Sequence, residues 1–174
     1  GVNAFQNCSG LQSIILPNSL ISIGNNAFNG CSNLMSITIP NSVNKIGTSA
    51  FVGTGWYNNQ PDGILYLSDC CLGYKGGKPT NSLDLVPGTR IISDNAFQGC
   101  SGITTLTIPN SVTSIGSRAF YNCRGFTEVH FNATNCQDNS SNSNSFLFCH
   151  GDTLYIGDNV TRIPANMFYG SEFL

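Results

Sequence analysis

Large apolar side chains return at a fixed interval along the chain. Phe5, Phe28 and Phe51 are 23 residues apart, and Phe97 follows after two further periods, with Tyr74 at the midpoint of that gap. In five places a cysteine comes three residues after the phenylalanine: Phe5/Cys8, Phe28/Cys31, Phe97/Cys100, Phe120/Cys123 and Phe146/Cys149. Such a period is typical of stacked repeats, which share one core because a single unit is too small to bury its own. We therefore expect the phenylalanine and cysteine ladders to lie buried inside a solenoid.

A two-residue alternation opens each unit and predicts a short strand with one buried face. It occurs in three units, at Ile14/Leu16, Ile37/Ile39 and Leu106/Ile108. The proline that follows ends each strand, since it lacks the N–H that a longer ladder needs. Farther on, Val112, Ile115 and Ala119 are three or four residues apart, which favours a short helical or irregular return. The predicted fold is an α/β-type repeat solenoid, right-handed and curved, in which strands of successive units form one parallel sheet.

The units that begin at Leu11, Leu34 and Ile103 share the pattern Leu-x-x-Ile-x-Ile-Pro-x-x-Val-x-x-Ile-Gly-x-x-Ala-Phe-x-x-Cys, with small variations. This pattern resembles the leucine-rich repeats of the BspA-like (Treponema pallidum-type) family, and the resemblance covers nearly all of the chain. It implies a curved leucine-rich-repeat stack with a parallel β-sheet on the concave face. It also implies a bacterial protein, secreted or displayed on the cell surface, that adheres to host extracellular-matrix proteins or to other bacteria. The family pattern contains no ligand motif, so no binding residue is carried over.

Two segments break the repeat within what we otherwise expect to be a single solenoid domain over residues 1–174, itself a fragment of a longer protein. In the irregular repeat at 52–82, apolar runs on either side of residues 68–70 predict a β-hairpin near 56–75. Trp56 and Tyr57 stand there, either as a binding ridge or as a plug that fills an irregular coil. The second break is a polar loop insertion at 132–145, which is rich in Asn and Ser and is predicted to be exposed and mobile.

The chain has eight cysteines, and their positions argue against a disulfide framework. Five occupy the ladder, where each faces the same residue one coil away at roughly 5 Å. That spacing permits a disulfide, but a column of reduced, buried thiols is the simpler interpretation. Cys70, Cys71 and Cys136 lie off the ladder, and their redox state is left open. Cys70 and Cys71 have no CxxC partner or neighbouring histidine that would favour metal binding, so we expect a structural role.

Composition narrows the function. Charged residues make up 9% of the chain, the net charge is −2, and the seven Lys and Arg residues are scattered. Nucleic-acid binding would need a basic stripe, and a membrane span would need about 18 consecutive apolar residues. Two histidines without a catalytic motif favour a non-catalytic protein that needs no cofactor. The cluster Cys149-His150-Gly151-Asp152 makes a poor metal site, because Cys149 fills an inward ladder position. No secretion signal is visible, and we expect it upstream of this sequence.

Side chains between the buried strand positions face outward and define a candidate binding surface. From the register these positions are Ser13, Ile15, Ser36, Thr38, Ser82, Asp84, Thr105, Thr107, Glu128, His130, Thr153 and Tyr155. A hydroxyl-rich stripe with Glu128, His130 and Tyr155 at one end suits an extended protein or glycan. A simpler alternative is that Ser and Thr are favourable residues on exposed strands. Three hypotheses follow: a protein-interaction or adhesion module, a spacer that displays another domain, and a glycan-binding surface at the aromatic insertion.

Overall fold

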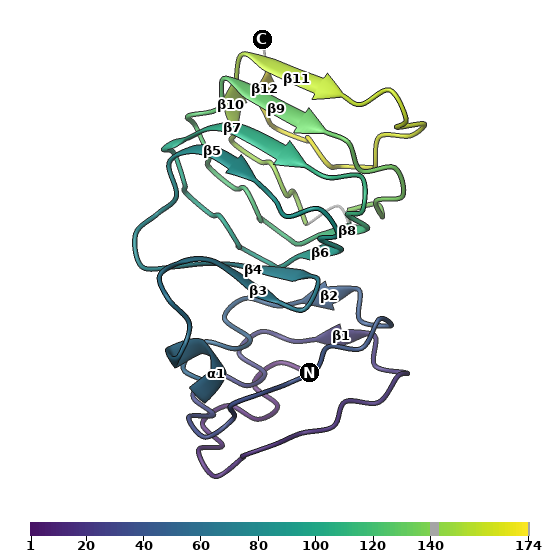
Figure 1. The fold of residues 1–174 in the computed structure, drawn as a ribbon. Coiled ribbons are helices and arrows are strands. Elements are labelled where there is room, and N and C mark those ends of the chain that lie inside the picture. The colour runs from purple at the N-terminus through teal and green to yellow at the C-terminus, as the bar shows by residue number, and fades with distance from the viewer. Residues whose placement is uncertain (140–142, 174) are drawn as a thin grey trace. The chain divides into compact units, whose positions relative to one another are not determined.

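A computed structural model describes residues 1–139 and 143–173. The protein is a β-solenoid built from parallel strands and almost no helix (Figure 1). Its chain forms two compact units, Gly1–Asp62 and Gly63–Leu174, and the irregular repeat at 52–82 contains the point where one ends and the next begins. Each unit is described by itself below. The curvature and right-handedness of the whole stack stay predictions.

The first unit consists of coils joined by parallel backbone hydrogen bonds. Strands β1 (Ser22–Ile23) and β2 (Lys45–Ile46) pair in parallel, and a single short helix, α1 (Gly55–Asn58), follows the last coil. The phenylalanine ladder is confirmed here, because Phe5 stacks on Phe28 at 5.3 Å between ring centroids and Phe28 stacks on Phe51 at 5.6 Å. Stacked rings one coil apart fix the coil spacing along the ladder.

The strands expected at Ile14/Leu16 and Ile37/Ile39 are not formed; residues 11–17 and 35–39, all of them described, are irregular. Only two coils of this unit contain the segment that was predicted to form a strand. In the next repeat, α1 and its flanking loop stand at the corresponding place in the sequence. The alternation still sets burial, because Ile37 and Ile39 are buried while Thr38 is exposed.

The second unit has one sheet that begins with a hairpin. Strands β3 (Gly63–Leu67) and β4 (Cys70–Lys75) pair antiparallel, which confirms the predicted β-hairpin. Two short strands, β6 (Ile91–Ile92) and β8 (Ser114–Ile115), then add in parallel, in the order β3-β4-β6-β8. Of the two alternatives for the return around Val112, Ile115 and Ala119, helical or irregular, the structure shows the irregular one. Its three-residue spacing belongs to a short strand followed by turns.

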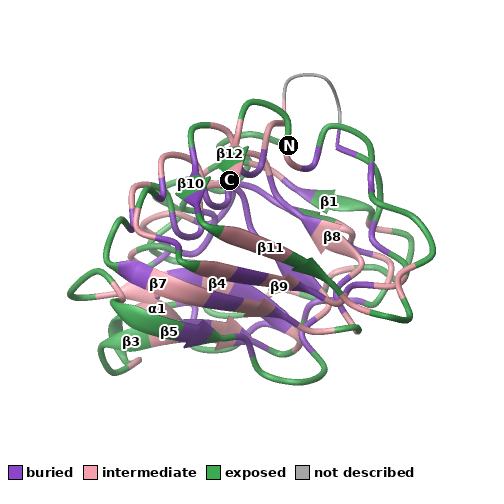
Figure 2. Cartoon of the chain, turned by 90° about the horizontal axis from the view of Figure 1, so that it is seen from above, coloured by how far each residue is buried: buried purple, intermediate pink, exposed green. Residues whose placement is uncertain are grey.

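A second sheet of this unit carries the predicted outward positions. It contains β5 (Asn81–Asp84), β7 (Ile103–Ile108), β9 (Glu128–Phe131) and β11 (Thr153–Ile156), all parallel and adjacent in that order. Figure 1 shows these four arrows one after another, pointing the same way. A small parallel pair, β10 (His150–Gly151) with β12 (Glu172–Phe173), completes the strands that the described residues form. Buried and half-buried residues alternate along β9 and from Thr105 to the end of β7 (Figure 2), as a one-sided strand requires.

A column of aromatic rings fills the core of the second unit. Tyr74, Phe97, Phe120 and Phe146 stack in succession at 6.4, 5.4 and 4.8 Å between centroids. Phe97, Phe120 and Phe146 are fully buried, which confirms the ladder within this unit. Stacking neighbours add to the stabilisation that burial of each ring provides.

The ladder prediction is wrong at its first step. Phe5 is 38% exposed and Cys8 is exposed, although both occupy ladder positions. These two residues belong to the first coil of the first unit, and the coil that contains Phe28 packs against one side of them. Burial in a solenoid needs a coil on both sides, so a ladder position does not bury its side chain by itself.

Three thiols of the cysteine column, those of Cys31, Cys123 and Cys149, donate to a backbone carbonyl of the preceding coil. Cys123 Sγ donates to Phe97 O at 3.1 Å, and Cys149 Sγ donates to Phe120 O at 2.8 Å. All eight cysteines lie among the described residues and are free, as predicted for the ladder. Burial raises the pKa of Cys100 to about 11, so this group is a neutral thiol that packs as a small hydrophobe.

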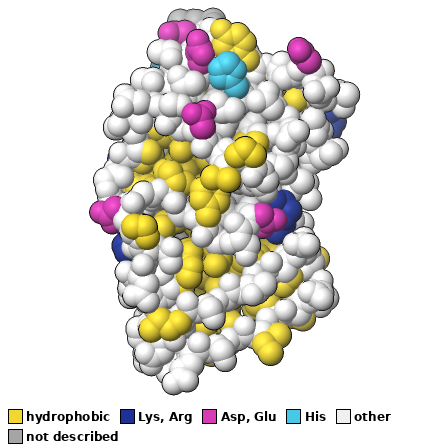
Figure 3. All heavy atoms as spheres, viewed as in Figure 1, with side chains coloured by type: hydrophobic (Ala, Val, Ile, Leu, Met, Phe, Trp, Pro, Cys, Tyr) yellow, Lys and Arg dark blue, Asp and Glu magenta, His cyan; other side chains and the backbone are white. Residues whose placement is uncertain are grey.

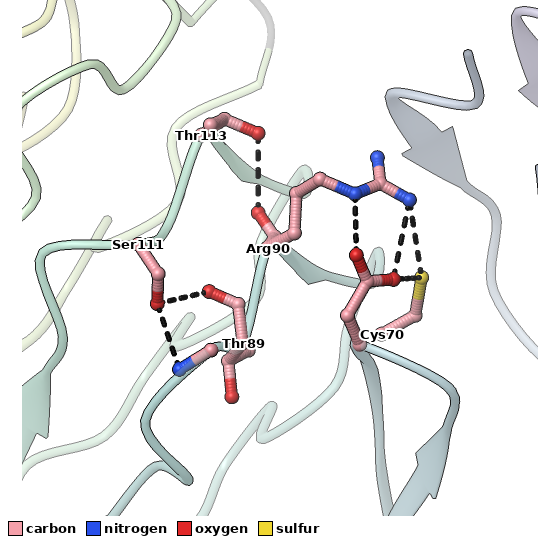
Figure 4. Close-up of polar contacts among 7 residues, drawn as sticks. Cys70, Thr89, Arg90, Ser111 and Thr113 are labelled. Carbon is pink, nitrogen blue, oxygen red and sulfur yellow. Dashed lines mark hydrogen bonds and ion pairs between the residues drawn. The ribbon is translucent and has the colours of Figure 1, made fainter. Parts of the chain in front are cut away.

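Two off-ladder cysteines, Cys70 and Cys71, are also buried. Burial, followed by hydrogen bonding to Asp69, raises the pKa of Cys70 to about 12. Arg90 Nε donates to Asp69 Oδ2 at 2.7 Å, and Cys70 Sγ donates to Asp69 Oδ1 at 3.3 Å (Figure 4). Burial alone would raise the pKa of Asp69, but the hydrogen bonds from Arg90 and Cys70 hold it below its usual value. Cys70 therefore belongs to a structural ion-pair cluster that joins β4 to the segment before β6.

The glycine of each Ile-Gly pair lets neighbouring coils approach closely. A Cβ at Gly116 would collide with the backbone of Ser93 and Asp94, and one at Gly47 would collide with the backbone of Gly24 and Asn25. At the same corner, Gly116 N donates to Ile92 O at 2.8 Å across the coils. The repeat pattern therefore needs glycine here because backbone from the preceding coil occupies the space of a side chain.

The prediction of an exposed loop at 132–145 is only partly correct for residues 132–139 and 143–145, which the structure describes: Asn135, Gln137 and Asp138 are exposed, but other residues are buried. Ala133 and Cys136 are buried in the core cluster, and Gln137 N donates to Thr113 O at 2.9 Å. Ala133 and Cys136 are three residues apart, the same spacing as Val112 and Ile115 in the preceding unit. The segment therefore continues the coil. Its predicted mobility at 140–142 lies outside the described residues.

Polar contacts hold the same segment against its neighbours. Asn139 Nδ2 donates to Ser145 Oγ at 2.8 Å, and Ser145 Oγ in turn donates to Gly116 O at 2.8 Å. Asp138 forms an ion pair with Arg162 from the following coil. Asn139 and Ser145 are buried, and each of these buried polar groups has a hydrogen-bond partner.

Candidate interaction surface

The outward positions of the second unit form two straight rows across the sheet β5-β7-β9-β11. Strand pairing aligns residues at equal heights, so that each row takes one residue from every strand. The first row is Ser82, Thr105, Glu128 and Thr153, and the second is Asp84, Thr107, His130 and Tyr155. We call these eight residues the outward rows. The structure thus brings together all eight positions that the sequence placed on this sheet.

Side chains within the outward rows hold one another in place. His130 and Tyr155 stack with ring centroids 4.6 Å apart and planes 9° apart. Glu128 Oε2 lies 3.1 Å from His130 Nε2. Tyr155 remains 45% exposed, so this end of the rows offers a fixed aromatic surface with a polar group on either side.

At the other end of the outward rows, the carboxyl group of Asp84 is held by hydroxyl groups. Ser82 Oγ donates to Asp84 Oδ2 at 2.8 Å. Hydrogen bonds from Ser82 and then Thr107, with a smaller contribution from His130, lower the pKa of Asp84 below its usual value. Asp84 is therefore ionised at neutral pH. Figure 3 shows histidine and acidic side chains near one another at the top of the view.

A groove with a volume of about 510 Å³ lies where the strands of this sheet end. Its polar lining comes from Asp84, Thr107, Asn110, Asn132, Asp158 and Asn159. Leu85, Pro87 and Pro109 supply apolar lining. Parallel strands bring their carboxyl ends to one edge, and these residues lie at or just beyond those ends. The sequence analysis missed the groove, although an Asn or Asp within two residues of each of β7, β9 and β11 is a repeated feature.

The four candidate positions of the first unit lie in irregular segments. Ser13, Ile15, Ser36 and Thr38 are all exposed, as predicted, and Ile15 is 95% exposed. The structure does not place them on paired strands. A rigid row such as that of the second unit is therefore not formed by these four residues.

Trp56 and Tyr57 lie on α1 in the first unit. Thr54 caps this helix by accepting a hydrogen bond from Tyr57 N at 3.0 Å. The Trp56 ring packs edge-on against Phe51 at 6.4 Å, and Trp56 N donates to Leu34 O at 2.9 Å. Both aromatic side chains are half-buried. These contacts favour a packing role for Trp56, and its use as a binding ridge stays a prediction.

The aromatic residues of the hairpin have structural contacts. Tyr66 Oη accepts a hydrogen bond from Val86 N at 3.0 Å, and Tyr74 stacks on Phe97. Both rings pack against the core cluster of the second unit. They therefore do not belong to the outward rows.

Metal-ligating side chains do not converge in the described ranges 1–139 and 143–173, where no group of three or more His, Cys, Asp or Glu residues is placed to hold an ion. His150 Nδ1 lies 3.2 Å from Glu172 Oε2, but the Cys149 thiol is buried and donates to a backbone carbonyl. Within the same ranges, no helix has the length and apolar character needed to cross a bilayer.

The coil architecture and the repeated unit define a leucine-rich-repeat solenoid. The family model described as the BspA type leucine rich repeat region matches six copies over residues 1–71 and 61–174, which together span the chain. This chain belongs to that family. No curated protein matches it.

Solved structures similar to this chain include two leucine-rich repeat proteins. The T. pallidum leucine-rich repeat protein is 22% identical, with a TM-score of 0.38 over 89% of this chain and 64% of its own. A leucine-rich repeat protein from Bacteroides ovatus is 18% identical, with a TM-score of 0.34 over 98% of this chain and 61% of its own. The chain therefore spans less than two thirds of either protein.

Proposed function

We propose that this chain is a non-catalytic interaction module that contacts a protein partner through the outward rows. Membership of a leucine-rich repeat family supports a protein–protein interaction role in general terms. The observation that carries the specific assignment is the stacked His130–Tyr155 pair, which stands on a four-stranded sheet with Glu128 beside it. Exposed aromatic residues on rigid elements are favoured anchors of protein interfaces, because they bury a large area at a small entropic cost.

The biological setting that we propose is adhesion by a secreted or cell-surface bacterial protein, with host extracellular-matrix proteins as partners. Family membership supports this setting. The outward rows suit it chemically, since hydroxyl groups of Thr105, Thr107 and Thr153 can hydrogen-bond a partner while Tyr155 supplies apolar area.

Binding to immobilised fibronectin, laminin and collagen tests the proposal. We expect the wild-type chain to bind at least one of them and Tyr155→Ala to weaken that binding about five- to hundredfold, as for an interface anchor. Tyr169→Ala is the matched control, because Tyr169 is an exposed tyrosine outside the outward rows. Retention of full affinity by Tyr155→Ala would remove the site assignment. Failure of the wild-type chain to bind any of the three would instead favour the spacer hypothesis.

A further inference from the structure

The groove at the end of the sheet has two kinds of wall. Pro87 and Pro109 supply apolar surface, and Asp84 and Asp158 supply carboxyl groups. In the described part of the chain, no Lys or Arg side chain lines it. An apolar wall that leads to carboxylates matches a long side chain whose stem is aliphatic and whose end is cationic.

Asp84 connects this groove to the outward rows. It is the last residue of β5, it aligns with Thr107 in the second row, and it also lines the groove. A segment that lies along the rows therefore passes the mouth of the groove. We infer that the groove receives a lysine or arginine side chain from an extended protein segment bound along the outward rows, an inference that rests on the proposed function.

The charge of the groove distinguishes between the side chains that could occupy it. Ser82 and Thr107 keep the Asp84 carboxylate oriented and ionised, and an anionic side chain would be repelled by it. A purely apolar side chain would cover the prolines but would take water from the carboxylates without offering them a positive charge, which is unfavourable. A lysine or arginine side chain matches both: its aliphatic stem covers the prolines, and its ammonium or guanidinium group makes charge-assisted hydrogen bonds to Asp84 or Asp158.

The probes for this inference are blocked heptapeptides of alternating Thr and Ser that differ at the central residue, which is Lys, Arg, norleucine or Glu. Each peptide is titrated into the ¹⁵N-labelled full chain, and amide shifts of Asn132 and Gly157, which line the groove, report occupancy. We expect the Lys and Arg peptides to bind about fivefold or more tightly than the norleucine peptide. High salt should remove that difference, because the carboxylates are solvent-accessible.

Variants identify the groups responsible. In the double variant Asp84→Asn with Asp158→Asn, the affinity for the Lys peptide should fall to that for the norleucine peptide. Asp152→Asn is the matched control, because Asp152 is exposed in the same unit but does not line the groove. The spectra of the free proteins verify that each variant is folded.

Three results would overturn the inference: equal affinity for the Lys and norleucine peptides, a Lys preference that survives in the double variant, or no shift of the groove amides by the Lys peptide. The proposed function is judged separately. Matrix-protein binding that depends on Tyr155 without any Lys preference would remove the groove inference alone. A Lys preference that requires both aspartates, in a chain that binds no matrix protein, would support the groove and remove the adhesion partner.

Discussion

His130 and Tyr155 lie face to face on neighbouring strands, with ring centroids 4.6 Å apart and planes that differ by 9°. Strand pairing places the two residues at the same height, so the parallel sheet itself produces the stack. The same repetition produces the buried stack of Phe97 on Phe120 in the core. The repetition of coils thus builds both the aromatic interior of the second unit and the stacked pair on its surface.

Removal of a ladder ring should be far more costly than removal of an exposed ring of the same kind. Phe120→Ala should lower the free energy of unfolding by about 3–5 kcal/mol, because it loses the transfer energy of a fully buried ring and leaves a cavity. Phe148, in the same unit, is 48% exposed, and Phe148→Ala should cost about 1 kcal/mol or less. Urea unfolding of the two variants measures both values. Similar losses in the two would contradict the account of the core.

The thiols should differ sharply in accessibility. Cys8 is exposed and the other seven cysteines are buried, so a thiol reagent should label Cys8 alone in native buffer and all eight in denaturant. Buried thiols such as Cys71, whose pKa is raised to about 11 by burial, are neutral as well as shielded. Mass spectrometry of the labelled chain locates the modified residue. Rapid native labelling of Cys100 or Cys123 would show that the column is open to solvent.

Close approach of coils makes Gly116 sensitive to the smallest substitution. Gly116→Ala should lower the free energy of unfolding by about 1–3 kcal/mol, because the added methyl group collides with the backbone at Ser93 and Asp94. Gly77→Ala is the control, since a Cβ there meets nothing within 4 Å. Thermal unfolding compares the pair. Equal stability of the two variants would mean that neighbouring coils have room for a side chain at the Ile-Gly corner.

The ion pair between Asp69 and Arg90 should contribute stability that acid removes. The folded state holds the pKa of Asp69 below its usual value. The ion pair therefore contributes its full stabilisation above the pKa of Asp69 in the unfolded chain, about 4. The stabilisation is lost as the pH falls through the lower pKa of Asp69 in the folded state. The stability difference between wild type and Asp69→Asn should thus narrow below about pH 4. Urea unfolding across this range measures it, and a difference that stays constant with pH would contradict the role of the pair.

The outward rows could be predicted from sequence because two local patterns agree. The alternation in residues 103–108 assigns inward and outward faces, and the 23-residue period carries that assignment to Glu128 and His130. For Tyr155, which follows His130 by 25 residues, the assignment comes from the local alternation in residues 153–156. In the first unit the same alternation predicted the burial of Ile37 and Ile39 correctly, but Ile14 and Leu16 are only half-buried and the expected strands do not form. The strands that pair there, β1 and β2, lie elsewhere in the coil.

The groove could not be predicted in the same way. Asn132 and Asp158 stand in short polar turns, where Asn, Asp and Gly are expected for their backbone preferences alone. They become groove residues because successive strands end at one edge. The burial of Ala133 and Cys136 was not predicted either. These two residues have the spacing of inward positions, but most residues around them are polar, which is typical of an exposed loop.

Carboxyl footprinting tests the central claim most directly. The chain is treated with a carbodiimide and glycine ethyl ester, alone and when bound to the matrix protein that it recognises, and each modified carboxylate is quantified by mass spectrometry. Our account predicts that the partner protects Asp84 and Glu128, which belong to the outward rows, and leaves Asp152 equally reactive in both states. Protection of Asp152 with unchanged labelling of Asp84 and Glu128 would contradict it.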